Sequence, residues 1–311
     1  MNVRLHHRSP AALFVGLAAV DISYTVDEIP RRNQKISVAG QQIGAGGPSA
    51  NAAATFASLG GRARLVTAVG RHPLAAVIRE DLRRSGVALH DLAGARNDPP
   101  PVSSIMVLRR TGERTVVSAN AAVFASVGSK FNARWLTGAS IVQVDGHYMK
   151  LGIAAARAAR ERGVQVVLDS GSWKPGMEEL LRFVDIAICS EDYRPPRCRD
   201  VADVFDFLRS RGIQRIGITR GPHGIRFLDR EGRGMIATPK VRAVDTLGAG
   251  DIFHGAFCYY ISQPGYEFRD ALTAAARVAS FSCRYPGTRK WMEKFRGRQQ
   301  GKIVLKKGGS A

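Results

Sequence analysis

Short runs of β-forming residues alternate with Ala-rich runs of helical character along most of this chain of 311 residues. The segment "ASIVQVDG" is typical of a strand, "LGIAAARAARERG" of a helix and "VQVVLDSG" of the next strand. Strands that alternate with helices favour a sheet whose strands run parallel. The pattern therefore predicts an α/β fold with a mostly parallel sheet and helices on both faces. In such sheets ligands bind outside the carboxyl ends of the strands.

The N-terminal segment "AALFVGLAAVD" is predicted to form the first buried strand, which ends on Asp21. Basic residues precede this apolar run, as they do in a signal peptide, but the run is short and ends on a carboxylate. Other apolar runs, such as Val164–Leu168, are also too short to span a bilayer. We therefore expect no membrane partner and a cytoplasmic location.

Two segments, about residues 22–43 and 100–120, interrupt the alternation because they show β-type patterns with no helix between them. The stretch "RRTGERT" in the second has the composition of a hairpin turn. We expect both segments to leave the main sheet and to pair into a small β lid. No Pro-rich or Ser-rich linker separates them, so the sequence predicts one domain over residues 1–290 that carries this lid.

The chain is strongly basic, with 46 Lys and Arg against 26 Asp and Glu and a net charge of +20. Such a charge is compatible with nucleic acid or another anionic partner. Arginine is spread along the whole chain, which favours a solvated basic surface over a dedicated nucleic-acid site. Only the end of the chain forms a local basic block, and we expect residues 291–311 to be a flexible tail.

The four cysteines form no C-x-x-C pair, and the seven histidines include no H-E-x-x-H motif. A structural zinc site and a disulfide framework are therefore not expected.

The stretch "DTLGAGDIFHGAF" carries the strongest chemical signal. Gly248, Ala249 and Gly250 lack bulk, so their backbone N–H groups can approach a ligand closely. An apolar helical run follows, and the free N–H groups and dipole of a helix N-terminus favour an anion. The carboxylate of Asp251 either caps this helix or acts as a general base beside a developing phosphate charge.

The stretch "DTLGAGD" resembles the C-terminal signature of the ribokinase/PfkB family of carbohydrate kinases. The stretch "GAGGPSANAAATFASLGGRARLVTAVG" resembles the N-terminal signature of the same family. The resemblance extends over roughly residues 12–290 in the order of predicted elements. It implies the ribokinase-like fold and an ATP-dependent kinase, with Mg²⁺ bound together with ATP.

The resemblance assigns roles to the residues of both signatures. Asp251 would take a proton from a sugar hydroxyl, and Gly248, Ala249 and Gly250 would form the anion hole for the transferred phosphoryl group. Asp245 falls where family members often bind a monovalent cation, so K⁺ is a further expected ion.

The sugar side of the site is implied by the N-terminal half of the chain. Asp21 matches a family aspartate that binds sugar hydroxyls, while Gly46, Gly47 and Asn51 match a glycine pair and an asparagine that contact the same sugar. Glycines admit a polyol edge, and a carboxylate with an amide can hold neighbouring hydroxyls.

The nucleotide side is implied by "ITRGPHGIRF", which resembles the family's strand and glycine turn. Thr219 and Gly221 would lie near the ATP phosphates and Gly224 would help to form the turn, although an ordinary β-turn explains the same residues.

The family's N-x-x-E motif is altered here, since Ser190 replaces the asparagine and Tyr193 replaces the glutamate. Glu191 is a candidate for the Mg²⁺-associated role in a shifted register, or a helix-start acid.

Several charged residues remain with two interpretations each. Lys35, Arg109, Arg110 and Arg114 fall on the predicted lid, where they either clamp an acidic substituent or protect exposed strand edges. The second interpretation is favoured. Asp145, His147 and Asp169 lie at strand ends, and His254 lies one helical turn beyond Asp251; packing and turn roles are favoured for Asp145, His147 and His254, and Asp169 is a candidate for the nucleotide side.

The sequence thus favours an ATP-dependent kinase of a small sugar of the ketohexose, fructose or ribose class. A nucleoside kinase of the same fold and a non-catalytic sugar-binding, nucleotide-binding or nucleic-acid-associated protein remain alternatives. Because lid sheets in this family often pair, the resemblance also implies a homodimer through the lid.

Overall fold

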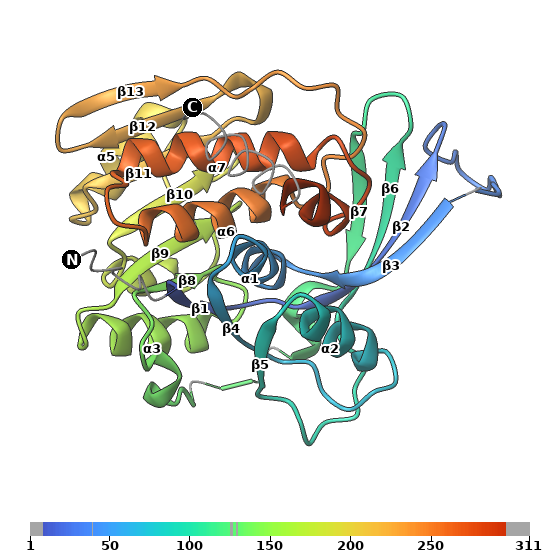
Figure 1. Ribbon diagram of the computed structural model, residues 1–311, viewed down its shortest axis with the longest axis horizontal. Helices are drawn as coiled ribbons and strands as arrows, with labels where there is room; N and C mark the ends of the chain where they lie inside the picture. Colours follow the sequence, from blue (N-terminus) through green and yellow to red (C-terminus); the bar gives the residue numbers. More distant parts are fainter. Residues whose placement is uncertain (1–8, 39, 125–126, 129, 297–311) are drawn as a thin grey trace, which may run out of the picture.

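The computed structural model describes residues 9–38, 40–124, 127–128 and 130–296 (Figure 1). Within them, nine strands form the main sheet in the order β13-β12-β11-β10-β9-β8-β1-β4-β5. The seven strands from β11 to β5 run parallel, and β12 and β13 extend one edge in antiparallel fashion. Their bounds are β1 Ala11–Val15, β4 Arg62–Thr67, β5 Val87–Asp91, β8 Ile141–Val144, β9 Gln165–Ser170, β10 Ile186–Ser190, β11 Arg215–Thr219, β12 Ile225–Asp229 and β13 Gly232–Ile236.

Helices cover both faces of this sheet, as the sequence predicts. One face packs against α1 (Pro48–Ser58), α2 (Ala75–Arg84), α6 (Ala249–Ile261) and α7 (Phe268–Ser282). The other packs against α3 (Met149–Arg160), α4 (Met177–Leu181) and α5 (Val201–Ser210). The described residues also contain three 3₁₀ turns: η1 Asn120–Phe124, η2 Ala133–Leu136 and η3 Gly221–His223.

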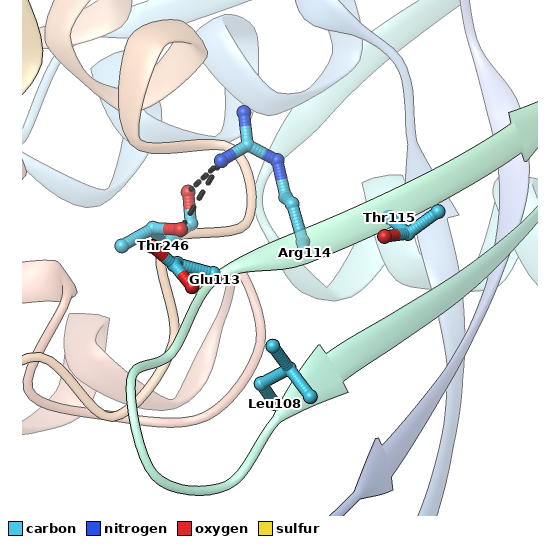
Figure 2. Close-up of a pocket in the computed structure, with 5 residues that line it drawn as sticks. All are labelled: Leu108, Glu113, Arg114, Thr115 and Thr246. Atoms are coloured by element: carbon cyan, nitrogen blue, oxygen red, sulfur yellow. Dashed lines mark hydrogen bonds between the residues drawn. The ribbon is translucent and has the colours of Figure 1, made fainter. Parts of the chain in front are cut away.

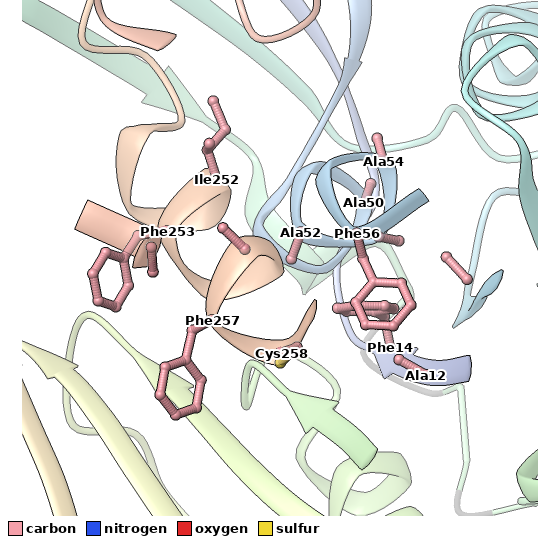
Figure 3. Packing of buried hydrophobic residues seen from close by; sticks show 14 of the residues in the cluster. Ala12, Phe14, Ala50, Ala52, Ala54, Phe56, Ile252, Phe253, Phe257 and Cys258 are labelled. Carbon is pink, nitrogen blue, oxygen red and sulfur yellow. The ribbon is translucent and has the colours of Figure 1, made fainter. Parts of the chain in front are cut away.

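Strand β1 shows how the sequence builds two cores. Successive side chains of a strand point to opposite faces, so an apolar run serves both faces at once. Phe14 faces the α1 side, where its ring lies 5.6 Å from the ring of Phe56, whereas Leu13 belongs to the core under α3 (Figure 3).

Helices α1 and α6 cross at close range, and this contact positions the start of α6. A Cβ atom on Gly255 would lie only 2.2 Å from the backbone oxygen of Ala52, so the two backbones meet where α6 has no side chain. Ala52 of α1 lies beside α6 at this crossing, whereas Phe257 points away from α1 and packs against Phe268 of α7 (Figure 3). The N-terminus of α6 is therefore held beside α1.

A second sheet of four strands projects from one side of the molecule (Figure 1). Its order is β3-β2-β6-β7, with β3 Gly40–Gly46, β2 Ala19–Val26, β6 Val102–Leu108 and β7 Arg114–Ser118. The predicted hairpin joins β6 to β7 in antiparallel pairing. The expected β lid is therefore present within the segments that break the helix–strand alternation.

The prediction of one long first strand ending on Asp21 is wrong. The chain leaves the main sheet after Val15, and β2 begins at Ala19 in the lid sheet. Gly16 makes the change possible, because a Cβ atom there would lie 2.1 Å from the carboxylate of Asp145. The residues between Val15 and Ala19 are as apolar as the strands on either side, so the hydrophobic pattern does not show where the first strand ends.

The boundary expected at residue 290 also falls too early. Residues 290–296 are helical, and Trp291 is fully buried, with its indole N–H donating to the Thr288 carbonyl at 3.0 Å. This part of the expected tail is packed into the fold, while residues 297–311 lie outside the described residues. In the part of the chain that the structure describes, no helix has the length and apolar character needed to cross a membrane.

Candidate active site

The loop before α6 bends sharply at Gly248, which has a left-handed φ of 66° and is the N-cap of the helix. A Cβ atom on Gly248 would lie 2.7 Å from the Thr288 methyl group, so both the conformation and the space favour glycine. The motif's first glycine therefore has a structural cause as well as an implied functional one.

Unused backbone donors cluster at this bend. Among the described residues, no oxygen accepts from the N–H groups of Gly248, Gly250 and Asp251, whereas Ala249 donates to the Thr246 carbonyl at 3.2 Å. Gly250 is exposed, Asp251 is half-buried and Gly248 is buried, so the Gly250 amide is the one most open to a ligand. Free N–H groups at a helix N-terminus suit a phosphate. Gly248 and Gly250 therefore have unused donors and Ala249 does not, and the anion-hole role of all three residues stays a prediction.

Asp251 lies at the edge of this group of amides, on the first turn of α6. Its Oδ2 accepts a hydrogen bond of 2.7 Å from Nδ2 of Asn51. Burial, reinforced by the charge of Asp169, raises the pKa of Asp251 to about 6, while the Asn51 hydrogen bond and His254 oppose the rise. A carboxylate that titrates near neutral pH suits a general base.

The residues predicted to bind the sugar lie next to Asp251, and two of them, Asp21 and Gly46, belong to strands of the lid. A Cβ atom on Gly46 would lie 1.9 Å from Oδ2 of Asp21, so the carboxylate covers this glycine directly. Burial raises the pKa of Asp21 to about 6, a hydrogen bond with Ser103 lowers it, and the charge of Asp251 raises it further. Gly47 has a φ of 92° and no room for a Cβ atom, which would lie 2.5 Å from the Leu17 carbonyl. The structure therefore brings Asp21, Gly46 and Asn51 together with Asp251.

Arg289 is a site residue that the sequence did not single out. Its Nη1 donates to Oδ1 of Asn51 at 2.8 Å, and its Nε donates to Oδ1 of Asp81 at 2.9 Å. The pair with Asp81 is mostly buried, with exposed side-chain fractions of 21% and 17%. No local pattern marks Arg289, which stands at the start of a basic block that suggests a solvated tail.

Asp245, the expected monovalent-cation residue, is buried and ties two loops together. Its Oδ1 accepts from the Leu247 amide at 2.8 Å and its Oδ2 from the Gly287 amide at 2.7 Å. Each carboxylate oxygen therefore has a backbone donor, and the cation role stays a prediction.

The predicted nucleotide residues form a separate group at the ends of β10 and β11. The Glu191 amide donates to the Thr219 carbonyl at 2.9 Å, and the Gly221 carbonyl accepts from Thr238 at 3.0 Å. Gly224 needs its missing side chain, because a Cβ atom would lie 2.6 Å from the Ile236 carbonyl. The described hydrogen bonds do not link this group to Asp251, so its contact with ATP stays a prediction.

The altered N-x-x-E region offers little to a metal. Tyr193 is fully buried against Trp173, with ring centroids 5.9 Å apart, and Glu191 pairs with Arg220 at 3.2 Å. Across the described residues, no group of three or more His, Cys, Asp or Glu side chains could hold a metal ion. The Mg²⁺-associated role predicted for Glu191 therefore stays a prediction, in which the ATP phosphates would supply the remaining ligands.

The lid touches the α6 bend through Arg114, whose Nη1 donates to the carbonyl and to Oγ1 of Thr246, both at 3.1 Å (Figure 2). Thr246 in turn donates from its hydroxyl to the Gly112 carbonyl at 2.9 Å. The contact borders a pocket of about 450 Å³ that is also lined by Leu108 and Glu113. Arg114 is therefore a docking contact of the lid, which the favoured interpretation of exposed lid arginines did not foresee.

The remaining strand-end residues have structural partners. The Asp145 carboxylate accepts from the Leu17 amide at 2.8 Å and from the Ser49 hydroxyl at 2.8 Å, which supports the turn role. His254 is buried with Nε2 3.1 Å from Oδ1 of Asp169. Burial lowers the pKa of His254 to about 4, and burial together with the charge of Asp145 raises that of Asp169 to about 8.

Known proteins share the sequence pattern and the fold of this chain. The sequence model described as pfkB family carbohydrate kinase matches residues 10–294. The ribokinase of Arabidopsis thaliana is 26% identical over 294 residues, which is 90% of this chain and 77% of the relative. An ATP-dependent ribose-1-phosphate kinase of Halopiger xanaduensis is 29% identical over 245 residues, covering 76% and 80%. The solved structure of Arabidopsis thaliana ribokinase complexed with ribose and ATP superposes with a TM-score of 0.71 at 24% identity, covering 92% and 98%.

Proposed function

Because this chain belongs to the pfkB family of carbohydrate kinases, we propose that it transfers phosphate from ATP to a hydroxyl of a small sugar at the N-terminus of α6. The membership confirms the fold and the enzyme class that the sequence predicts. The acceptor and the roles of individual residues go beyond it and are argued from the site.

One observation carries the proposal: a half-buried carboxylate, Asp251, stands between unused amides and the polar floor of the lid. The amides of Gly248 and Gly250 lie on its one side. Asp21 lies close enough to Asp251 for the charge of Asp251 to raise the pKa of Asp21. A phosphoryl group and a sugar hydroxyl could therefore meet beside a group that accepts a proton.

The proposed reaction needs little covalent help from the protein. The acceptor hydroxyl forms a bond to the γ-phosphorus while the bond from that phosphorus to the ADP oxygen breaks. Asp251 takes the hydroxyl proton in this step, and the amides of Gly248 and Gly250 stabilise the negative charge on the phosphoryl oxygens. The docked lid keeps water, a competing acceptor, away from the site.

Small polar side chains favour a sugar as the acceptor. Asp21 and Asn51 offer a carboxylate and an amide that can bind neighbouring hydroxyls, and Ser103 on the adjacent lid strand shares a hydrogen bond with Asp21. The relatives named for ribose and ribose 1-phosphate make pentoses the first acceptors to test, with fructose and other ketohexoses next.

A substrate panel tests the proposal directly. The protein is incubated with Mg·ATP and, in turn, D-ribose, 2-deoxy-D-ribose, D-fructose, ribose 1-phosphate, fructose 6-phosphate and adenosine, and ADP release is measured. We expect release to depend on a sugar or sugar phosphate. Release with adenosine alone would favour the nucleoside kinase, and no release with any acceptor would refute the proposal.

Three accompanying expectations remain proposals. The exposed apolar side chains of Ile43, Val116 and Val117 on the lid strands suit a homodimer formed through the lid. We also propose a cytoplasmic location and a K⁺ ion at Asp245. Measuring turnover as a function of K⁺ concentration tests the proposed K⁺ ion.

A further inference from the structure

We propose that Arg289 is a positioning residue for the reaction, which acts on Asp251 through the side-chain amide of Asn51. The inference rests on the proposed function in that Asp251 is the base. It adds a residue from the far end of the chain to the machinery of the two sequence signatures.

The argument starts from the hydrogen-bonding ability of the guanidinium group, which donates only. Because Nη1 of Arg289 donates to Asn51 at 2.8 Å, the amide oxygen of Asn51 must face the arginine. The amide nitrogen then faces the other way, where it donates to Oδ2 of Asp251 at 2.7 Å. Arg289 thus determines which end of the amide meets the carboxylate.

Arg289 is itself held rigidly enough to do this. Its Nε pairs with Asp81 of α2, its Nη2 donates to the Ala45 carbonyl at 3.2 Å, and its Nη1 also donates to the Thr288 hydroxyl at 2.9 Å. A side chain with this many hydrogen-bond partners cannot rotate freely, so the orientation of the guanidinium group is fixed before any substrate binds.

Loss of the arginine would free the Asn51 amide to rotate and to present its oxygen to Asp251. Two facing oxygens favour a protonated carboxyl, so the base would hold its proton to higher pH. The other charged groups that act on Asp251 or approach it are Asp21, Asp169, His254 and Arg114. Of these, Asp21 also loses a nearby positive charge, because the charge of Arg289 lowers the pKa of Asp21. This direct effect of the charge remains when Asn51 is absent, so a comparison with and without Asn51 isolates the effect of the amide.

The size of the effect follows from one hydrogen bond. A net loss of about 1.4 kcal/mol, which is one tenfold change in the proton affinity, would raise the pKa of Asp251 by about one, from about 6 to about 7. The ionised fraction at pH 6 would then fall about fivefold, whereas at pH 8 it would hardly change.

The test compares Arg289→Met with the wild type on the best acceptor of the substrate panel, with kcat and KM measured from pH 5 to pH 9. We expect kcat to fall about fivefold at pH 6 and little at pH 8. Arg289→Lys, whose ammonium also only donates, should restore the profile. Lys290→Ala, a change at the exposed neighbouring cation, is the control and should match the wild type. An equal loss at every pH would overturn the inference.

A double-mutant cycle asks whether Asn51 carries the effect. In an Asn51→Ala background, Arg289→Met should shift the profile much less than it does when Asn51 is present, and a shift of equal size would contradict the relay.

Carboxyl NMR titration of the intact protein, with the Asp251 signal assigned through Asp251→Asn, gives an arm that needs no turnover. A higher midpoint for Asp251 in Arg289→Met supports the inference, and an unchanged midpoint overturns it. If the wild type turns over no acceptor, the proposed function fails while this titration still decides the relay.

Discussion

Replacement of Asp251 by asparagine should remove turnover and, at the same time, stabilise the protein at alkaline pH. The variant keeps the size of the side chain but cannot take a proton. Loss of a general base lowers rates by about 10²- to 10⁴-fold, so kcat should fall at least a hundredfold. The affinity for Mg·ATP, measured by calorimetry, should stay within about twofold because the backbone amides remain in place.

The stability effect follows from the pKa of Asp251, which burial raises from 3.8 to about 6. The native state therefore binds this proton more tightly than the unfolded state, and stability present below pH 3.8 is lost as pH rises to about 6. The total is about 3 kcal/mol as an upper bound, of which about 1 to 2 kcal/mol falls between pH 5 and pH 8. Because asparagine does not ionise, the Asp251→Asn variant does not lose this stability as pH rises.

Urea denaturation of both proteins at pH 5 and pH 8, combined with ADP release, gives the complete readout. The stability of Asp251→Asn relative to the wild type should be about 1 to 2 kcal/mol greater at pH 8 than at pH 5. Near-normal turnover in the variant would refute the role of Asp251 as the base. A relative stability that does not depend on pH would refute the argument from its burial.

Three further substitutions test the surroundings of the site. Gly250→Ala meets no atom within 4 Å, so the fold should keep its stability while the added methyl group obstructs the phosphoryl position and lowers kcat at least tenfold; unchanged kcat would place the phosphoryl group elsewhere. Gly255→Ala should destabilise the protein by about 1–3 kcal/mol in urea denaturation, because it forces α1 and α6 apart. The matched change Gly152→Ala, also within a helix but with only an ordinary contact at 3.9 Å, should be neutral or stabilising, and equal effects would contradict the packing argument. Arg114→Ala removes the lid contact with the α6 bend and should raise the KM for the sugar about fivefold or more, whereas Arg110→Ala should not; equal KM values would show that the contact does not hold the lid over the sugar.

The sequence predicts those features of the molecule that local pattern determines. Neighbouring residues determine the alternation of strands and helices, the two segments that form the lid and the bend at "DTLGAGD". The hairpin of the lid follows from its turn composition. Each of these features depends on contacts between residues that are close in the chain, so periodicity and turn chemistry are sufficient to find them.

Contacts between distant segments escape such reasoning. Arg289 reaches Asn51 across 238 residues and Asp81 across 208, and no spacing rule connects them. The break after Val15 depends on the Asp145 carboxylate, which lies more than a hundred residues further along the chain. The buried Tyr193 likewise became evident only when its packing against Trp173 was visible. The site is thus predictable in its two signatures and not in the residues that orient them.

The central claim is that the bend at Gly248 binds the transferred phosphoryl group while Asp251 faces the acceptor hydroxyl. A crystal structure with Mg·ADP, the best acceptor sugar and a fluoroaluminate ion, which imitates a phosphoryl group in transfer, measures this arrangement directly. The account predicts the fluoride atoms within hydrogen-bonding distance of the Gly248 and Gly250 amides, and one sugar hydroxyl bonded to Asp251. A fluoroaluminate ion bound away from these amides, or a sugar whose hydroxyls do not reach Asp251, would contradict it.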